Sequence, residues 1–397
     1  MVLYLKPYKL IKTKHKEFFM EKVETPAKKA RDPFWDIMKG IGALCIVAGH
    51  AAWNLVGTYV YTFHLAIFFF IGGALFKPEH AKDPWKYLGS RFKNMYGKYV
   101  MYSFIYIFLH NTFIGWGLYS SGGQWGMQPY TINDLLTNLY NALLFGTNET
   151  LLEALWFVIT LLMAMCIFCF VQHYLGKIKN KIANNIISVI VYLAIAYIGT
   201  YIEMQDLQFT ERTQCVLMMV PLVWLGFKYR EYQHVLGKFV KWWAILPFAL
   251  LNYFALKWTG TNIDLSKNMI ISPIWFYVLS LSGTYMCMGL SQLINKWKVS
   301  RWCFAKMGEY SFEIMALHFT AFKVVIWLYD TLKGATAFLK VDLQSFPTMA
   351  GDRFWYYYIP AGVILPIAFV GGLRWLRKKI FSIDLGKILK KNDKLAA

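Results

Sequence analysis

The stretch DIMKGIGALCIVAGH, residues 36–50, is an apolar run with an aspartate and a lysine near its start and a histidine at its end. Most of this run suits a lipid environment, whereas an ionisable side chain inside a membrane span is costly and is a functional hypothesis by default. The run therefore predicts a membrane helix that carries a chemically useful imidazole, that of His50.

The composition of the whole chain supports a membrane protein. Of its 397 residues, 57% are hydrophobic and only 16% are charged, whereas roughly a quarter of the residues are charged in ordinary soluble domains. The net charge of +20 would indicate a nucleic-acid partner in a soluble protein. Here the basic residues lie in the gaps between apolar runs, so we expect the lipid bilayer as a partner and no nucleic acid.

Ten apolar runs are long enough to be membrane spans, which need about 20 residues each. We expect helices, because lipid offers no hydrogen-bond partner to unpaired backbone groups. The chain is thus predicted to be an all-α membrane protein of about ten transmembrane helices. The runs are 35–56, 58–76, 97–118, 151–173, 184–203, 209–227, 241–258, 272–293, 309–330 and 354–373.

The basic residues predict the orientation of these helices. If the N-terminus lies in the cytoplasm, most of the 42 Lys and Arg residues fall on the cytoplasmic side, as the positive-inside rule requires. The connection 117–150 has no Lys or Arg, as expected of an outer loop. We therefore predict both termini in the cytoplasm, a basic N-terminal segment 1–34, a transmembrane domain 35–373 and a basic tail 374–397.

Four histidines lie within the predicted spans: His50, His64, His110 and His318. His50 follows Lys39 by eleven residues, or roughly 16 Å along a helix, which places it deep in the membrane. The short link between the first two spans makes them antiparallel neighbours, so the imidazoles of His50 and His64 can meet if their helix faces agree. A hydrogen bond to a neighbouring helix is the structural alternative for each histidine, and we favour it for His110.

Two carboxylates also belong to apolar runs. Glu153 opens the fourth run, and Glu313 precedes His318 by five residues, a spacing that puts the two side chains on different helix faces. We expect no metal site, because the six cysteines lie in or beside apolar runs, where thiols pack as small apolar groups.

Three stretches resemble the acyltransferase-3 family of membrane acyltransferases, in its branch of polysaccharide and fucose O-acetylase-like proteins. They are RDPFWDIMKGIGALCIVAGH (31–50), YVYTFHLAIFFFIGGALF (59–76) and MGEYSFEIMALHF (307–319), with a weaker match in LWFVITLL (155–162). The chain departs from the family where Ala66 and Gly72 replace the usual Pro and Ser. It departs again where Asn94 takes the second basic place of an R-x-x-R pair that begins at Arg91.

The resemblance implies transfer of an acetyl group from cytoplasmic acetyl-CoA to a hydroxyl of an extracytoplasmic polysaccharide or lipid-linked sugar. It also implies a location in the plasma membrane of a bacterium. Imidazole accepts and returns a proton near neutral pH, so His50 is our candidate general base, with an acyl-histidine intermediate as the alternative. His64 and His318 are candidates to orient His50 or polarise the thioester, and Glu153 is the fourth catalytic candidate.

The donor's phosphates need cations near the inner membrane face. We assign this role to Lys39, Arg91, Lys93 and Lys98, although Lys39 and Asp36 are equally consistent with a helix-end ion pair. A multi-helix transporter or lipid-linked sugar flippase fits the same features and is the main alternative, and an amino-sugar N-acetyltransferase is a second. The sequence leaves open the glycan, the length of the acyl chain and the oligomeric state.

Overall fold

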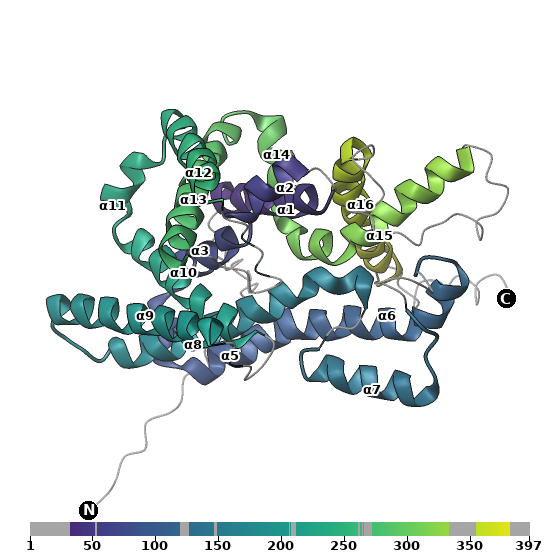
Figure 1. The fold of residues 1–397 in the computed structure, drawn as a ribbon, viewed down its shortest axis with the longest axis horizontal. Helices are drawn as coiled ribbons and strands as arrows, with labels where there is room; N and C mark the ends of the chain where they lie inside the picture. The colour runs from purple at the N-terminus through teal and green to yellow at the C-terminus, as the bar shows by residue number, and fades with distance from the viewer. Residues whose placement is uncertain are drawn as a thin grey trace, which may run out of the picture. The chain divides into compact units, whose positions relative to one another are not determined.

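In the structure, a computed structural model, helices are the only regular secondary structure among the described residues (Figure 1). These residues are 32–51, 54–119, 127–146, 149–205, 207, 212–260, 263, 265, 272–332 and 355–381. Residues from Pro33 onward form one compact unit. Most of the predicted N-terminal segment 1–34 and of the tail 374–397 lies outside the described residues.

The helices of the first half are α1 (Pro33–His50), α2 (Asn54–Tyr61), α3 (Ala66–Ala74), α4 (Pro78–Lys82), α5 (Pro84–Arg91), α6 (Gly97–Gly115), α7 (Ile132–Leu143) and α8 (Trp156–Leu175). Those of the second half are α9 (Lys181–Met204), α10 (Thr213–Glu231), α11 (Gln233–Leu236), α12 (Ile245–Thr259), α13 (Pro273–Ile294), α14 (Lys298–Glu309), α15 (Ser311–Leu332) and α16 (Trp355–Phe381). Short turns of other helical types complete the chain: η1 (Phe92–Tyr96), η2 (Thr150–Leu155), η3 (Gly237–Phe239) and η4 (Trp242–Ala244).

The prediction of an all-helical membrane protein is confirmed, but the count of about ten spans is not. Six described helical segments are long and apolar enough to cross a membrane, and a seventh is added if the bent pair Gln233–Phe239 and Trp242–Thr259 forms one span. The runs predicted at 35–56, 97–118 and 209–227 do form helices, namely α1, α6 and α10, but these are not among the six. Charged residues within α1 and α10, and polar ones within α6, reduce the apolar character of these helices.

One predicted span is interrupted. The segment Val56–Ala74 has the length and composition of a span, yet α2 ends at Tyr61 and α3 begins only at Ala66. The residues between them form a tight turn in which the backbone N–H of His64 donates to the carbonyl of Val60 at 2.8 Å. Non-helical backbone at membrane depth is tolerated where it is buried in protein, and His64 is buried.

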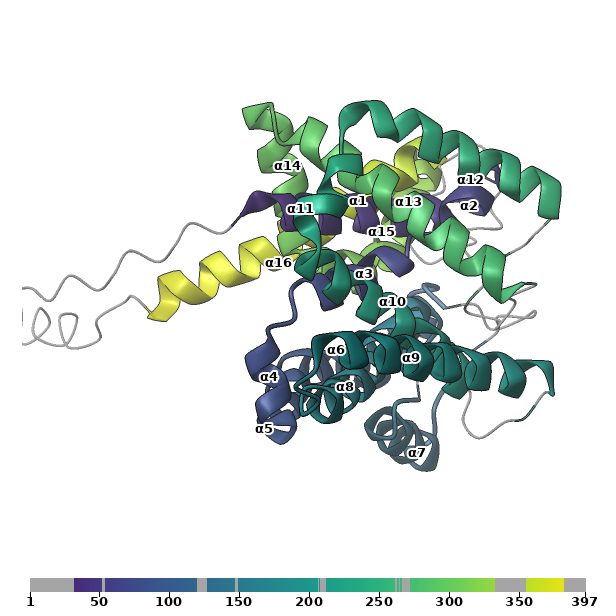
Figure 2. The ribbon, with the colours of Figure 1, turned by 90° about the vertical axis from the view of Figure 1, so that its left-hand side faces the viewer.

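Glycines allow the closest helix pairs to pack backbone to backbone. α1 with α14 and α3 with α10 are the most extensive contacts in the described chain, and both pairs lie side by side in two perpendicular views (Figures 1 and 2). A side chain at Gly40 would overlap the carbonyl of Phe304, and one at Gly226 would overlap that of Phe70. Small residues at membrane helix interfaces permit this approach, and α1 is thereby held firmly in the unit.

The predicted outer connection 117–150 contains a helix that the sequence did not predict. At one end of α7, the Tyr96 hydroxyl donates to the carbonyl of Leu143 at 2.8 Å. Before the other end, the Asn111 side-chain amide donates to the carbonyl of Tyr130 at 2.9 Å. Because Tyr96 and Asn111 lie at opposite ends of α6, α7 runs antiparallel along that helix. Residues 120–126 and 147–148 of this connection lie outside the described part.

Candidate active site

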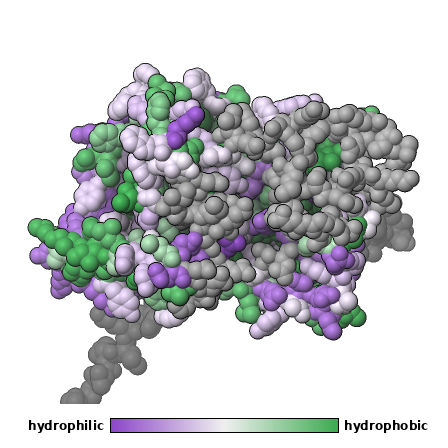
Figure 3. Space-filling model, in the orientation of Figure 1, coloured by the Kyte–Doolittle hydropathy of each residue, from purple (hydrophilic) through white to green (hydrophobic). Residues whose placement is uncertain are grey.

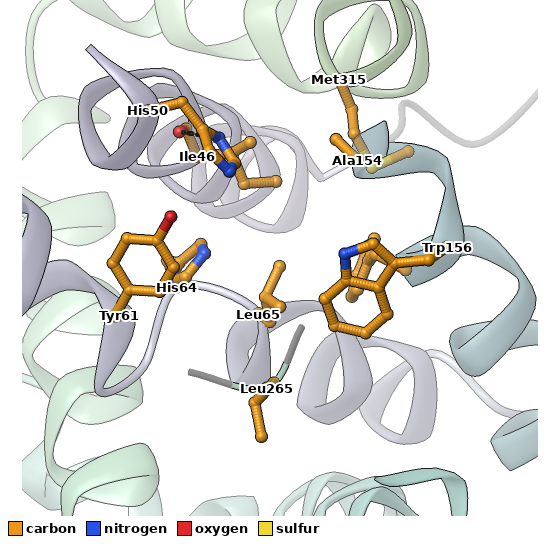
Figure 4. Close-up of a pocket in the computed structure, with 10 residues that line it drawn as sticks. Ile46, His50, Tyr61, His64, Leu65, Ala154, Trp156, Leu265 and Met315 are labelled. Atoms are coloured by element: carbon orange, nitrogen blue, oxygen red, sulfur yellow. Dashed lines mark hydrogen bonds between the residues drawn. The ribbon is translucent and has the colours of Figure 1, made fainter. Parts of the chain in front are cut away.

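A small cavity lies where α1, the turn after α2, and the start of α8 meet (Figure 4). Its volume is about 30 Å³, which is room for one or two water molecules. His50, Tyr61 and His64 lie on one side of the cavity and Trp156 on the other (Figure 4). The structure thus places in one cavity wall the two histidines that, from the sequence, can meet if their helix faces agree.

The His50 ring is oriented by its own helix. Its Nδ1 lies 2.9 Å from the carbonyl oxygen of Ile46. A carbonyl can only accept a hydrogen bond, so Nδ1 carries the proton and donates it, and in the neutral ring Nε2 keeps the lone pair. His64 and His318 repeat the arrangement, with Nδ1 at 2.8 Å from the carbonyls of Val60 and Met315 respectively.

His318 on α15 lies directly against His50. The two ring centroids are 5.1 Å apart, and His318 is fully buried. Its Nε2 has no hydrogen-bond partner among the described residues, which is a costly state for a buried polar atom. Tyr61 connects this pair to the third histidine, because its ring lies 6.0 Å from that of His50 and 4.9 Å from that of His64.

The turn that presents His64 is held by polar side chains from α12 and α13. Ser280 donates to the backbone carbonyl of Thr62 at 3.4 Å, and the Asn252 amide donates to the Thr62 hydroxyl at 3.4 Å. Asn252 also donates to the carbonyl of Leu279 at 3.3 Å. These contacts supply the hydrogen bonds that a broken membrane helix would otherwise lack, so they determine where His64 lies.

Comparison with known families agrees with this geometry. The family model of the acyltransferase-3 type, an acyltransferase domain, matches residues 32–373. The chain belongs to the acyltransferase-3 family. No curated protein and no solved structure matched the chain in the same comparisons. The match spans α1 through most of α16 and therefore includes every residue of the cavity.

The fourth catalytic candidate of the acyltransferase, Glu153, lies in η2 beside the cavity rather than in its wall. Its neighbour Ala154 lines the cavity, as does Trp156. Arg212, which the sequence analysis did not select, lies over the Trp156 ring with its guanidinium carbon 4.8 Å from the ring centroid. The signal that could have revealed it is a lone arginine at the start of an apolar run on the predicted outer side, where cations are scarce.

The four cations assigned to the donor do not line the cavity of the acyltransferase. Lys39 pairs with Asp36 at 3.6 Å, as the helix-end alternative predicted. Arg91 lies over the Tyr87 ring at 4.9 Å, and Lys93 is exposed on η1. The predicted donor role of these residues stays a prediction.

Lys98 belongs to a charged cluster between α6, α15 and α16. Its Nζ donates to Glu313 Oε1 at 3.0 Å, and the Arg374 guanidinium donates to the same oxygen at 2.6 Å. Glu313 is buried, whereas both cations are partly exposed. The sequence analysis placed Arg374 in the tail, but α16 continues to Phe381 and carries this arginine back to Glu313.

His110 makes hydrogen bonds to connecting segments rather than to the neighbouring helix that we favoured, and one partner is a carboxylate that the sequence analysis missed. Its Nδ1 lies 3.1 Å from both oxygens of Glu149, and its Nε2 lies 3.0 Å from the carbonyl of Gln128. Both ring nitrogens thus face acceptors, so the ring is held between Glu149 and the backbone of the segment before α7.

Two tyrosines complete the pairing of Glu149. The Tyr119 hydroxyl donates to Glu149 Oε2 at 2.6 Å, and the Tyr130 hydroxyl donates to Oε1 at 3.1 Å. Burial and the neighbouring carboxylate raise the pKa of Tyr119 well above its ordinary value. This network fastens the segment before α7 to the end of α6, and it lies apart from the residues that line the cavity.

Proposed function

We propose that this acyltransferase moves an acetyl group from acetyl-CoA on the cytoplasmic side to a hydroxyl of an extracytoplasmic polysaccharide or lipid-linked sugar, with His50 as the general base. The observation that carries the proposal is that His50 and His64 line one cavity of an acyltransferase-3 domain, with His318 packed against the His50 ring. Proton abstraction from a hydroxyl by a positioned side chain is worth roughly 10²- to 10⁴-fold in rate.

The orientation of His50 supports this role. With Nδ1 donating to the carbonyl of Ile46, Nε2 takes the hydroxyl proton. The hydroxyl oxygen bonds to the thioester carbonyl carbon, the carbon–sulfur bond then breaks, and the CoA sulfur leaves with its electron pair. The proton held on Nε2 passes to that sulfur, so the products are an acetyl ester and free CoA, and His50 returns to its neutral form.

The other groups of the cavity are suited to stabilise the reacting atoms. The thioester oxygen gains negative charge as the hydroxyl attacks, and hydrogen-bond donors aimed at that charge are usually a major source of catalysis. Tyr61 lines the cavity, its ring contacts those of both His50 and His64, and its hydroxyl is a hydrogen-bond donor. We propose that this hydroxyl donates a hydrogen bond to the thioester carbonyl oxygen. We propose that His318 holds the His50 ring in position through their ring contact.

Binding requires the cavity to widen. A volume of about 30 Å³ holds water, but not a thioester and a sugar hydroxyl together. The side chains that must turn aside belong to the wall, and Trp156 opposite the histidines is the largest of them (Figure 4). The donor's phosphates remain outside the lipid, where we propose that Arg91 and Lys93 contact them, since neither joins the Glu313 cluster.

The test is acetyl transfer by the purified full-length protein. Radiolabelled acetyl-CoA is incubated with the protein in vesicles and with a glycan extract, and the label in the glycan is counted before and after mild alkali. We expect alkali-labile label, which identifies an O-acetyl ester. Label that survives alkali would indicate an N-acetyltransferase, and the absence of label with every glycan tried would contradict the proposed reaction.

A further inference from the structure

A second and larger cavity lies between α4, the end of α8, the start of α9 and the end of α10, with a volume of about 370 Å³. Its polar wall contains Lys179, Lys181, Lys228 and Glu231, and Phe76 and Phe227 provide an apolar part. We propose that this cavity binds the phosphate headgroup of an anionic membrane phospholipid. The proposal is independent of the acetyl-transfer reaction.

The cavity lies at a membrane surface. Thr150–Leu175, which ends with α8, and Lys181–Met204, which is α9, both have the length and composition of membrane spans. The chain leaves the first at Leu175 and enters the second at Lys181, so this connection must lie where the membrane meets water. Lys179 and Lys181 lie between the fourth and fifth predicted runs, and Lys228 follows the sixth, so the predicted orientation puts all three on the cytoplasmic side. Basic residues there interact favourably with anionic lipids.

The cavity wall carries an excess of positive charge. Lys228 donates to Glu231 Oε2 at 2.8 Å, and Lys181 lies 3.6 Å from Glu231 Oε1. Glu231 therefore bridges two of the three ammonium groups, and the wall as a whole keeps two uncompensated positive charges. A phosphate entering the cavity would meet a site that is already organised for an anion.

The wall is also preorganised by amide hydrogen bonds. Asn185 accepts from Lys228 Nζ at 2.8 Å and donates to the Tyr232 hydroxyl at 3.0 Å. These contacts fix Lys228, whose side chain is 15% exposed, with its ammonium group beside Glu231. A charged group held in this way loses little conformational freedom when a ligand binds, which favours affinity.

The surface beside the lysines favours a lipid over a soluble phosphate. Exposed apolar side chains recur along α9 at every third or fourth residue, beginning next to Lys181, and so share one face. They are Ile182, Ile186, Ile190, Leu193 and Tyr197. The hydrophobic surface around α9 is visible on the left of the space-filling view (Figure 3). A phospholipid can place its acyl chains on this face while its phosphate reaches the cavity, and basic pockets between membrane helices bind such headgroups.

The experiment measures lipid binding to the delipidated full-length protein in detergent by native mass spectrometry. The probes are dioleoylphosphatidylglycerol, as the anionic lipid, and dioleoylphosphatidylcholine. Each lysine near an anionic surface contributes about five-fold to affinity, so Lys179→Ala with Lys181→Ala should weaken phosphatidylglycerol binding about 25-fold. Glu231→Gln should strengthen it, because that substitution removes the competing carboxylate. Both lysines are exposed, so the double variant is expected to fold.

Lys177→Ala is the matched control, because Lys177 lies over the Tyr174 ring and outside the cavity wall. It should leave phosphatidylglycerol binding unchanged. Equal binding of the two lipids by the wild type, or wild-type phosphatidylglycerol affinity in the double variant, would overturn the proposal. It would also be overturned if the double variant lost affinity for CoA while keeping that for phosphatidylglycerol, since the cavity would then hold the donor's phosphates.

Discussion

The buried pair of His110 and Glu149 allows a quantitative prediction about stability. Glu149 is 3% exposed and accepts hydrogen bonds from His110, Tyr119 and Tyr130. Glu149→Ala removes the acceptor of three hydrogen bonds at once, and each buried donor left unsatisfied costs about 1–3 kcal/mol. Tyr119→Phe removes only one hydrogen bond to a charged group, which is worth about 1.5–3 kcal/mol.

The assay is thermal unfolding of the purified protein in detergent, followed by intrinsic fluorescence, together with hydrogen exchange of the segment 127–131. We expect Glu149→Ala to lower the melting temperature more than Tyr119→Phe, and both to increase exchange in that segment. The double variant should lose less than the sum of the two, because the groups share one network.

Glu79→Ala is the control for this comparison, since it removes an exposed carboxylate on α4. If Glu149→Ala melted within one degree of Glu79→Ala and its exchange were unchanged, the reasoning about a buried hydrogen-bond network would be refuted.

Three other predictions follow from individual contacts. Gly226→Ala places a methyl group against the carbonyl of Phe70. It should reduce the free energy of unfolding by about 1–3 kcal/mol, measured as a lower melting temperature. Gly89→Ala is the control, because a side chain at Gly89 would have no neighbour within 4 Å. Asn252→Ala removes the hydrogen-bond donor to the turn at Thr62, so it should lower kcat more than it changes the KM for acetyl-CoA. If the variant were expressed at the wild-type level with an unchanged kcat, Asn252 would not position His64. The backbone N–H and hydroxyl of Thr131 lower the pKa of Asp134 below its ordinary 3.8. Ionised Asp134 therefore stabilises the start of α7 above about pH 3.8, and this stabilisation is lost as the pH falls through the lowered pKa of the folded state. Hydrogen exchange of α7 should accelerate over that pH range in the wild type but not in Asp134→Asn.

Most of the helices could be predicted from the apolar runs. His50, His64 and His318 could be selected because ionisable residues are rare within such runs. The short link between their helices made a meeting of His50 and His64 possible if the helix faces agreed, and both residues line the cavity. The contact between His50 and His318 could not be predicted in this way. α15 is far along the chain from α1, and only the packing of the helices determines which face of α15 meets α1.

Other features left little trace in the sequence. The interruption after Tyr61 lies in a continuous apolar run, and it is stabilised by Asn252 and Ser280, which are distant in sequence. Glu149 lies in a polar connection, where an acidic residue is unremarkable until its burial against His110 is known. Lys98 appeared available for a phosphate, whereas its partner Glu313 belongs to another helix.

The most direct measurement of the central claim is single-turnover acetyl transfer by His50→Ala and His50→Gln, compared with the wild type at saturating acetyl-CoA. The account predicts a rate lower by about 10²- to 10⁴-fold, with an unchanged melting temperature and unchanged binding of acetyl-CoA. A folded His50→Ala protein that transferred acetyl groups at the wild-type rate would contradict it.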